Sequence, residues 1–367
     1  MAVSHGDTVP AGSTGTVQES ATSEHLTSSP SIAESRGGYG ELTAQIRALG
    51  LLRHRPWSYV GTFALVFAGL TAVVVAMVLW QHSWWLLLLA PALGVIATQM
   101  GFLGHDVGHL QVTRNLTRSR ILGLVDGNLL GGLSYGWWVA KHNAHHAHPN
   151  DLEGDPDVRA GALVFDAGQA ADRHGLAAWT TRHQAALFFP FLLGEAVNLH
   201  VASIRRLLQP GLRLRTPEAL LLVTHFVAYV VLLVTTLTWV QALLFVAIHK
   251  GVQGLYLGCS FAPNHKGMPT LDPDQAADPL LRQVLTSRNV RGGPFIDAVL
   301  GGLNYQIEHH LFPSMPRANL RHAQPVVRQF CGDRGIPYLQ SSVIASYAAT
   351  LTHLRDVGDP LRRAGGP

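Results

Sequence analysis

The sequence predicts an all-α integral membrane protein with four transmembrane helices in two hairpins and a helical cap on the cytoplasmic side. Three observations predict this fold class. Of the 367 residues, 47% are hydrophobic and only 14% are charged, well below the ~25% that is usual in soluble domains. The apolar residues are gathered in long runs, and no Lys or Arg lies in the two predicted hairpin turns.

Four apolar runs predict the transmembrane helices. Residues 59–80 and 84–104 carry no charged side chain, and ~20 such residues cross the ~30 Å hydrocarbon core of a bilayer. A third run covers residues 219–234 and contains one histidine, His225, which we interpret as structural. The fourth begins near residue 237 and ends near residue 248. Buried helices of a soluble core are the alternative, and runs this long and free of charge disfavour it.

The distribution of basic residues predicts the orientation in the membrane. The turns near residues 80–84 and 235–239 contain no Lys or Arg, so all 27 basic residues belong to the segments on the other side. Cytoplasmic segments carry such an excess, so both termini and the central segment are predicted to be cytoplasmic. The same bias explains the net charge of +4, and no basic stripe interleaved with aromatic residues suggests nucleic-acid binding. Because Arg greatly outnumbers Lys, we expect a bacterial inner membrane.

The chain is predicted to form one domain between two less ordered ends. Residues 1–38 are rich in Ser, Thr and Gly and are predicted to be disordered. They have no basic segment followed by an apolar core, so they do not resemble a signal peptide. Residues 39–347 form the predicted membrane domain, and residues 348–367 are expected to be a frayed tail.

Two segments between the hairpins are apolar but are not predicted as ordinary spans. Residues 121–139 are interrupted by Asp126, Asn128 and several glycines, which indicates an interfacial or re-entrant segment. Residues 187–208 place charged and polar side chains on an otherwise apolar helix. We interpret this segment as an amphipathic helix on the membrane surface, with a true span as the alternative.

Three clusters of histidines stand far apart in the chain, each with helical spacing. Their sequences are HDVGH, HNAHH and QIEHH, and residues three or four apart share one face of a helix. All three clusters lie in the segments predicted to be cytoplasmic, where they can meet at one site. The clustered residues are His105, His109, His142, His145, His146, Gln306, His309 and His310.

Histidines in such clusters indicate metal binding. Protonated imidazoles at one point would repel one another, and neutral ones offer lone pairs that need a partner, so a metal ion resolves both problems. Seven imidazoles exceed the four ligands of one tetrahedral zinc site, which favours two metal ions. The residue types alone leave Fe, Cu, Zn and Ni open. Outside the clusters, His148 is a weaker candidate because Pro149 ends its helix, and His200 and His249 are ambiguous.

The three clusters, in this order and with these hairpins between them, resemble the histidine boxes of the membrane fatty acid desaturases. The third box extends to GGLNYQIEHHLFPSMPR, residues 301–317. Its Gln in place of a first His resembles front-end desaturases and related bacterial acyl-lipid or acyl-CoA desaturases. FAPNHKG, residues 261–267, is similar to an additional histidine region of that family. The resemblance covers residues 40–345.

The resemblance implies a non-haem di-iron centre in the cap, with O2 as co-substrate. The seven clustered histidines and His265 would be ligands, and Gln306 would occupy the position of a ninth. Asn264 would lie beside the ligands. Carboxylates that could accept the outer ring N–H of a ligand histidine are Asp106, Asp155, Asp157, Asp297 and Glu308.

The implied reaction is the O2-dependent introduction of a cis double bond into a fatty acyl chain. The substrate would lie in an apolar tunnel. Trp137 and Trp138 are candidates for its lining, and the alternative is that they anchor the membrane interface. Its head group, a lipid, CoA or a carrier, stays open. Many front-end desaturases carry a fused cytochrome b5 domain with an HPGG motif, and this sequence has no HPGG. We therefore expect an external electron donor such as a ferredoxin or a flavin reductase, together with membrane lipids as partners.

Two other functions are compatible with histidine clusters in a membrane protein. A hydroxylase on the same iron scaffold would add oxygen to the acyl chain instead of removing a second hydrogen. A metal transporter would need ligands along a pathway through the membrane. The predicted position of all three clusters outside the spans, on one side, argues against transport.

Overall fold

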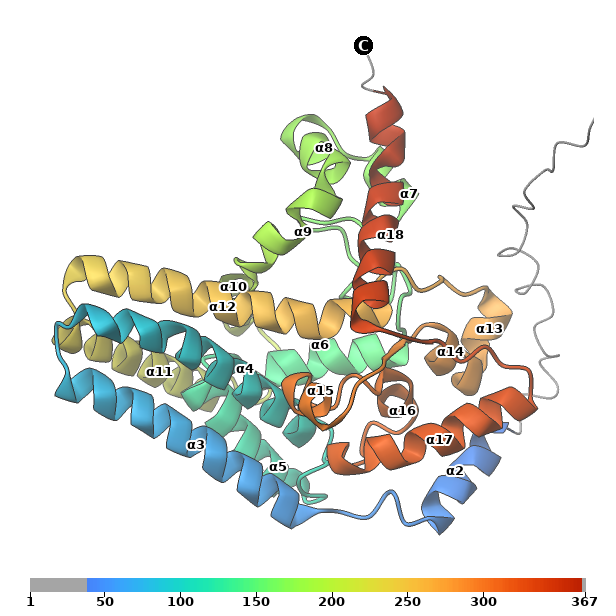
Figure 1. Ribbon diagram of the computed structural model, residues 1–367, viewed down its shortest axis with the longest axis horizontal. Coiled ribbons are helices and arrows are strands. Elements are labelled where there is room, and N and C mark those ends of the chain that lie inside the picture. Colours follow the sequence, from blue (N-terminus) through green and yellow to red (C-terminus); the bar gives the residue numbers. More distant parts are fainter. Residues whose placement is uncertain (1–37, 365–367) are drawn as a thin grey trace, which may run out of the picture.

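The computed structural model describes residues 38–364, and most of them lie in helices (Figure 1). Within this range, strands β1 (Asn289–Val290) and β2 (Gln340–Ser341) form a two-residue parallel pair. The all-α fold class is therefore confirmed for the described residues. The expectation of disorder for residues 1–38 lies outside them except at Gly38, which begins the first described helix.

Four helical segments are long and apolar enough to cross a membrane, as the sequence predicts. The fourth is much longer than expected, because it continues past Ile248 to His265. His249 and Lys250 therefore lie inside a helix, where Lys250 Nζ donates to His200 Nε2 and Gln253 Oε1 at 3.0 Å each. The segments are α3 (Pro56–Leu79), η2 (Trp84–Leu88) with α4 (Leu89–Gly108), α11 (Arg215–Thr236) and α12 (Trp239–His265).

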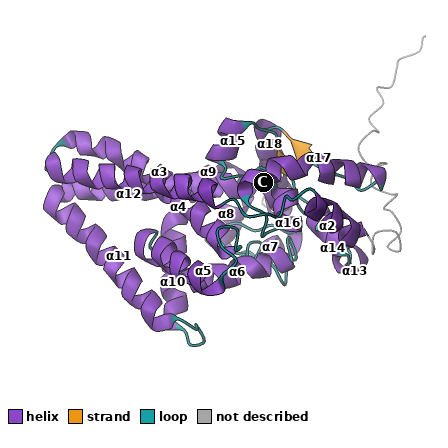
Figure 2. Cartoon of the chain, turned by 90° about the horizontal axis from the view of Figure 1, so that it is seen from below, coloured by secondary structure: helices purple, strands orange, loops and turns teal. Residues whose placement is uncertain are grey.

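The two predicted hairpins pack together through α4 and α12. A Cβ on Gly94 of α4 would lie 3.0 Å from the carbonyl oxygen of His249, so the glycine permits this close approach. At the far end the two turns are joined, because the His82 N–H donates to the Thr236 carbonyl at 2.8 Å. Helix α11 splays away from the other three spans (Figure 2).

The segment after the first hairpin folds back against the spans instead of forming a fifth span. It comprises α5 (Leu116–Gly123), the π-helix η3 (Leu124–Leu130) and α6 (Tyr135–Ala147). Between η3 and α6 the chain turns at Gly132, whose φ is +69°. A side chain there would also meet His225 Nε2 at 2.5 Å. The turn thus places α6 against the end of the spans.

A cap of short helices covers one end of the spans (Figure 1). Its apolar core contains Leu42, Leu281, Ile307 and Val327, all nearly inaccessible to solvent. Burial of these side chains holds together helices that are far apart in the chain. The cap helices are α2 (Gly38–Ala48), α13 (Pro273–Ala277), α14 (Pro279–Leu285), α15 (Pro294–Val299), α16 (Gln306–Leu311) and α17 (Arg317–Asp333).

A second group of helices projects beside α12 and corrects two expectations. The single amphipathic helix predicted over residues 187–208 is two helices bent by 71°, with the break at Leu193 and Gly194 after Pro190. Residues 348–364 of the predicted tail are not frayed, because Leu354 and Val357 are buried against this group. The group contains α7 (Ala167–Ala171), α8 (Gly175–Arg182), α9 (Gln184–Leu192), α10 (Glu195–Leu208) and α18 (Val343–Ala364).

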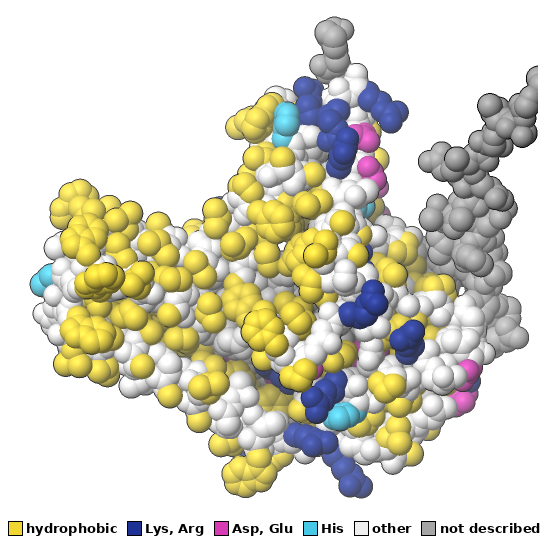
Figure 3. Space-filling view, in the orientation of Figure 1, with side chains coloured by type: hydrophobic (Ala, Val, Ile, Leu, Met, Phe, Trp, Pro, Cys, Tyr) yellow, Lys and Arg dark blue, Asp and Glu magenta, His cyan; other side chains and the backbone are white. Residues whose placement is uncertain are grey.

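The surface divides into an apolar and a basic region. Hydrophobic side chains cover the spans, whereas Lys and Arg appear over the cap and along α18 (Figure 3). Leu65, Val234 and Leu243 are 64–74% exposed on the spans. Exposed large aliphatic side chains on three different spans are what a helix facing lipid requires.

Candidate metal centre

The first histidine cluster lies where α4 ends. His105 is in the last turn, and His109 caps the helix with its N–H 3.1 Å from the His105 carbonyl oxygen. Leu110 follows with a φ of 58°, which stops the helix. Gly108 leaves room for the ring of Trp138, since a Cβ there would lie 2.5 Å from it. The two imidazoles thus face α6.

The second cluster lies on α6 and the third on α16. Ser134 caps α6 by accepting the Trp137 N–H at 3.2 Å, so the helix begins two turns before its histidines. Helix α16 follows Gly301, whose φ is +59° and whose missing side chain makes room for the ring of Phe102 on α4. This contact places α16 against the first cluster.

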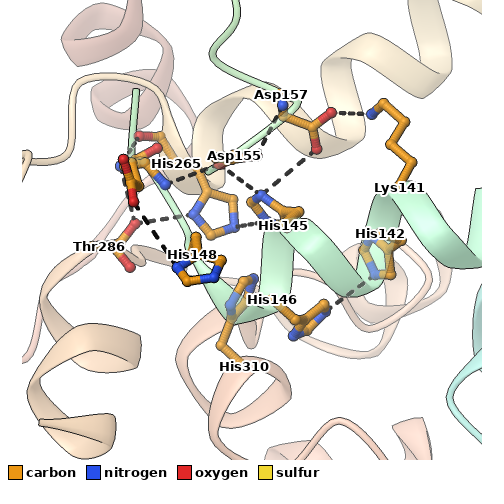
Figure 4. A network of polar contacts seen from close by, with 12 residues as sticks. Lys141, His142, His145, His146, His148, Asp155, Asp157, His265, Thr286 and His310 are labelled. Carbon is orange, nitrogen blue, oxygen red and sulfur yellow. Dashed lines mark hydrogen bonds and ion pairs between the residues drawn. The ribbon is translucent and has the colours of Figure 1, made fainter. Parts of the chain in front are cut away.

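The eight predicted histidines meet in two groups, and the ligand atoms within each group lie within 4.8 Å of one another. In the five-histidine group, Nε2 of His309 lies 3.1 Å from Nε2 of both His105 and His146. In the three-histidine group, Nε2 of His145 lies 3.3 Å from Nε2 of His265. Figure 4 shows His142, His145 and His146 projecting from α6 toward this region. The groups are His105, His109, His142, His146 and His309, and His145, His265 and His310.

The donor chemistry of both groups fits metal ions. Nitrogen ligands that share one ion at ~2.0–2.1 Å lie about 3.0–3.4 Å apart, and the Nε2 pairs fall in this range. His109 Nε2 and His310 Nε2 are buried and have no hydrogen-bond partner among the described residues. Burial and the neighbouring imidazoles hold the pKa of both rings well below its usual range, and the same holds for the pKa of His142, His146 and His309. Neutral rings with free lone pairs are what a metal ion binds.

Four of the rings are oriented through their outer nitrogen. His145 Nδ1 lies 2.9 Å from Asp155 Oδ2, and His105 Nδ1 lies 3.2 Å from Asp106 Oδ1. The other two contacts were not expected from the sequence: His265 Nδ1 to the Thr286 carbonyl at 3.0 Å and His310 Nδ1 to Gln283 Oε1 at 2.9 Å. Nothing in the local sequence marks Gln283 or Thr286, because only the packing of α14 brings them to the site.

Three of the five carboxylates considered from the sequence do not orient a ring. Asp157 Oδ2 stays 3.7 Å from His145 Nδ1, while its other oxygen pairs with Lys141 (Figure 4). Asp297 accepts from Asn304 and Tyr305. Glu308 points away from the histidines because Asn289 and Tyr338 donate to it at 2.7 Å each. These last two carboxylates therefore stabilise the cap.

Gln306 lies beside the three-histidine group. Its Nε2 is 2.9 Å from His265 Nε2, and Asn264 Nδ2 donates to its Oε1 at 3.2 Å. The carboxamide is therefore placed where a ninth ligand was predicted, with Asn264 behind it.

The weaker histidine candidates lie outside both groups. The His148 side chain is 54% exposed. His200 contacts Lys250, and His249 contacts Tyr229.

A cavity of about 330 Å³ lies alongside the histidines. His105, His142, His145 and His265 contribute to its wall together with Gln306, and the rest of the lining is largely apolar. The apolar tunnel expected from the sequence stays a prediction, and both tryptophans considered for it line this cavity. Apolar and aromatic residues in the wall include Met100, Trp137, Trp138, Phe188, Leu192, Leu257 and Phe261.

Four apolar helices, together with buried histidines beside a largely apolar cavity, are typical of a membrane enzyme that acts on an apolar chain. The fatty acid desaturase family model matches residues 82–342, so the chain belongs to that family. The enzyme is accordingly an oxidoreductase that desaturates fatty acyl chains.

Relatives with known names agree with this assignment. The chain is 29% identical to a Delta(8)-fatty-acid desaturase of Helianthus annuus, over 86% of this chain and 72% of the relative. It is 29% identical to an acyl-lipid (9-3)-desaturase of Borago officinalis, over 89% of this chain and 76% of the relative. It is 30% identical to the Delta(6)-fatty-acid desaturase fat-3 of Caenorhabditis elegans, over 77% and 67%.

Proposed function

We propose that this desaturase uses two non-haem iron ions and O2 to introduce a cis double bond into an acyl chain bound in the cavity. The observation that carries the proposal is the pair of histidine groups beside an apolar cavity. Iron bound there would supply the redox chemistry that activates O2 and removes hydrogen from an unactivated methylene. Acid–base catalysis cannot do this, because such a methylene has no acidic proton and no basic atom.

The two groups divide the proposed ligands between the two ions. Five imidazoles would hold one ion, and three imidazoles with Gln306 would hold the other. The amide nitrogen of Gln306 now lies 2.9 Å from His265 Nε2. The amide would therefore have to flip for its carbonyl oxygen to complete the smaller group. The proposed ligands are His105, His109, His142, His146 and His309 for the first ion, and His145, His265, Gln306 and His310 for the second.

The protein itself positions the acyl chain and excludes water. Leu257 and Phe261 of α12 form one wall of the cavity and Trp137 and Trp138 of α6 another, so a methylene beside the histidines is held among apolar groups. A fixed chain reacts at one pair of carbons, and a dry site prevents loss of reactive oxygen species to solvent.

The site faces the cytoplasm, and its electrons come from a separate carrier. The distribution of Lys and Arg supports this orientation. The proposed donor is an external electron carrier such as a ferredoxin or a flavin reductase. The named relatives come from plants and a nematode. The proposal of a bacterial inner membrane is therefore supported only by the excess of Arg over Lys in the sequence. The name of the Borago relative supports a lipid-linked acyl substrate.

The proposal is tested by expressing the protein in a host with a ferredoxin and its reductase, then measuring bound iron and mapping new double bonds. We expect two iron ions per chain and fatty acids that have lost two hydrogens. His146→Ala should abolish the product, whereas His148→Ala should retain it, because His148 lies outside both groups. A product that gains one oxygen would identify a hydroxylase. Unchanged lipids with iron bound and electrons supplied would contradict the proposal.

A further inference from the structure

Asp126 is a buried carboxyl group that faces the cavity without a partner. It belongs to the π-helix η3, is 5% exposed and lines the same cavity as His105. Its side chain makes no hydrogen bond and no ion pair within residues 38–364. Burying an unsatisfied polar group costs free energy, so such a group in a folded protein calls for an explanation.

The fold makes room for this carboxyl group next to the first histidine cluster. A Cβ on Gly104 would lie 2.7 Å from Asp126 Oδ2, so α4 can pass the carboxyl group only because residue 104 is glycine. Gly104 immediately precedes His105. Short π-helical turns within helices often occur at functional sites, and here the π-helix carries Asp126 to the cavity wall.

Asp126 is not placed to be a metal ligand or a structural ion pair. It joins neither of the two histidine groups. The other carboxylate at this position, Asp106, is paired with Arg317 Nε at 2.5 Å and lies 3.2 Å from His105 Nδ1. Asp126 has no such cation, and burial together with the nearby Asp106 raises the pKa of Asp126 to about 8. Asp106 is thus held by a cation and by a histidine, whereas Asp126 is left without a partner at the cavity.

The reaction consumes protons at this place. One saturated carbon pair, one O2, two electrons and two protons yield one cis double bond and two waters. The acyl chain supplies two of the four hydrogens in the waters, the external electron carrier supplies the electrons, and two protons must enter a cavity whose walls are largely apolar.

We propose that Asp126 is the catalytic residue that delivers these protons to the reduced oxygen, an inference that rests on the proposed O2-dependent function. In each transfer the O–H bond of the Asp126 carboxyl group breaks, and the proton forms an O–H bond of a product water. The carboxylate then takes up the next proton from solvent. A carboxyl group that lines the same cavity as the histidines, next to Gly104, and that is buried and free of hydrogen-bond partners has the position and the proton that this step requires.

The test uses the iron-loaded enzyme with its ferredoxin, reductase and acyl substrate. For Asp126→Asn we expect normal iron content, about 100-fold slower desaturation, fewer double bonds per O2 consumed and increased release of hydrogen peroxide. The solvent deuterium isotope effect should change as well, because proton transfer then limits the rate.

Two further variants serve as rescue and control. In Asp126→Glu the rate of desaturation should rise at least about tenfold above that of the Asn variant, since glutamate restores a proton donor. Asp278→Asn is the matched control, because Asp278 is equally buried but caps α14 outside the cavity.

The outcomes separate this inference from the proposed function. Wild-type enzyme that forms no double bonds would refute the O2-dependent function. An active wild type together with an Asp126→Asn variant of unchanged rate, coupling and isotope effect would overturn only the role of Asp126. Loss of iron in both Asp126→Asn and Asp126→Leu would also overturn it, because the carboxyl group would then be structural.

Discussion

At the scale of single residues, a hydrogen-bond contact of the outer nitrogen orients four of the histidine rings and so decides where the inner nitrogen points. Asp155 and Asp157 approach the same His145 Nδ1, at 2.9 Å and 3.7 Å. Asp155 is fully buried and also accepts the Asn150 N–H at 2.9 Å, which fixes its position. Asp157 is bound instead to Lys141. One of two adjacent carboxylates therefore orients the ring, and the other holds the neighbouring loop.

This difference predicts unequal effects on metal binding. Asp155→Asn should weaken the three-histidine group about 10–100-fold, the range for partners that orient metal ligands. Iron content should then fall by about one ion per chain at limiting iron, since the five-histidine group does not contact Asp155. Metal analysis of the purified variants measures this. Asp157→Asn is the control and should keep its iron, and equal losses in the two variants would contradict the assignment.

At the scale of elements, α18 is part of the fold. It packs against α12 and the helices α7–α9, with Leu354 fully buried. In the same helix Ile344 is 83% exposed, so two similar aliphatic side chains occupy opposite environments. The expectation of a frayed tail failed because Leu354 and Val357 pack against residues of other helices that lie far away in the sequence.

Leu354→Ala should therefore destabilise the protein by about 2–5 kcal/mol, the cost of a cavity at a buried leucine. Ile344→Ala should change the stability by less than about 0.5 kcal/mol, as is usual for exposed positions. Thermal unfolding of the detergent-solubilised variants measures both. A Leu354→Ala protein that unfolds at the same temperature as the Ile344→Ala protein would show that α18 contributes nothing to stability.

At the scale of the whole molecule, the histidine groups connect the membrane helices to the cap. The five-histidine group draws on α4, α6 and α16, and the three-histidine group on α6, α12 and α16. Bound metal would thus cross-link both hairpins to α6 and to the cap helix α16. Ions that bind only the folded protein shift its unfolding equilibrium in proportion to their affinity.

Removal of metal should lower the unfolding temperature of the whole domain. At a free metal concentration ~1,000 times the dissociation constant, binding contributes about 4 kcal/mol, enough to be seen in a thermal scan. The measurement compares the metal-loaded protein with protein stripped by a chelator, and adding iron back should restore the higher temperature. An unchanged midpoint after verified metal removal would count against a shared metal centre at these residues.

Much of the architecture could be predicted because its signals are local. Runs without charge predict spans, since any unpaired charge in hydrocarbon is costly, and four such segments are present. The fourth span was predicted to end near residue 248, before Lys250. The helix continues because Lys250 Nζ donates a hydrogen bond to His200, a residue of another helix. The bend between α9 and α10 was missed because it depends on close packing, where a Cβ on Gly254 would lie 2.4 Å from the Leu192 carbonyl.

The sequence by itself determined the residue types of the candidate site and their arrangement on helical faces. Spacing of three and four residues places His142, His145 and His146 on one side of α6 wherever that helix lies. Only the tertiary structure decided that His145 separates from its two neighbours to join His265 and His310. It also decided that Asp126 meets Gly104 at the cavity. Helical spacing is set by neighbouring backbone bonds, whereas these partners lie tens to hundreds of residues apart and are brought together by packing of the spans and the cap.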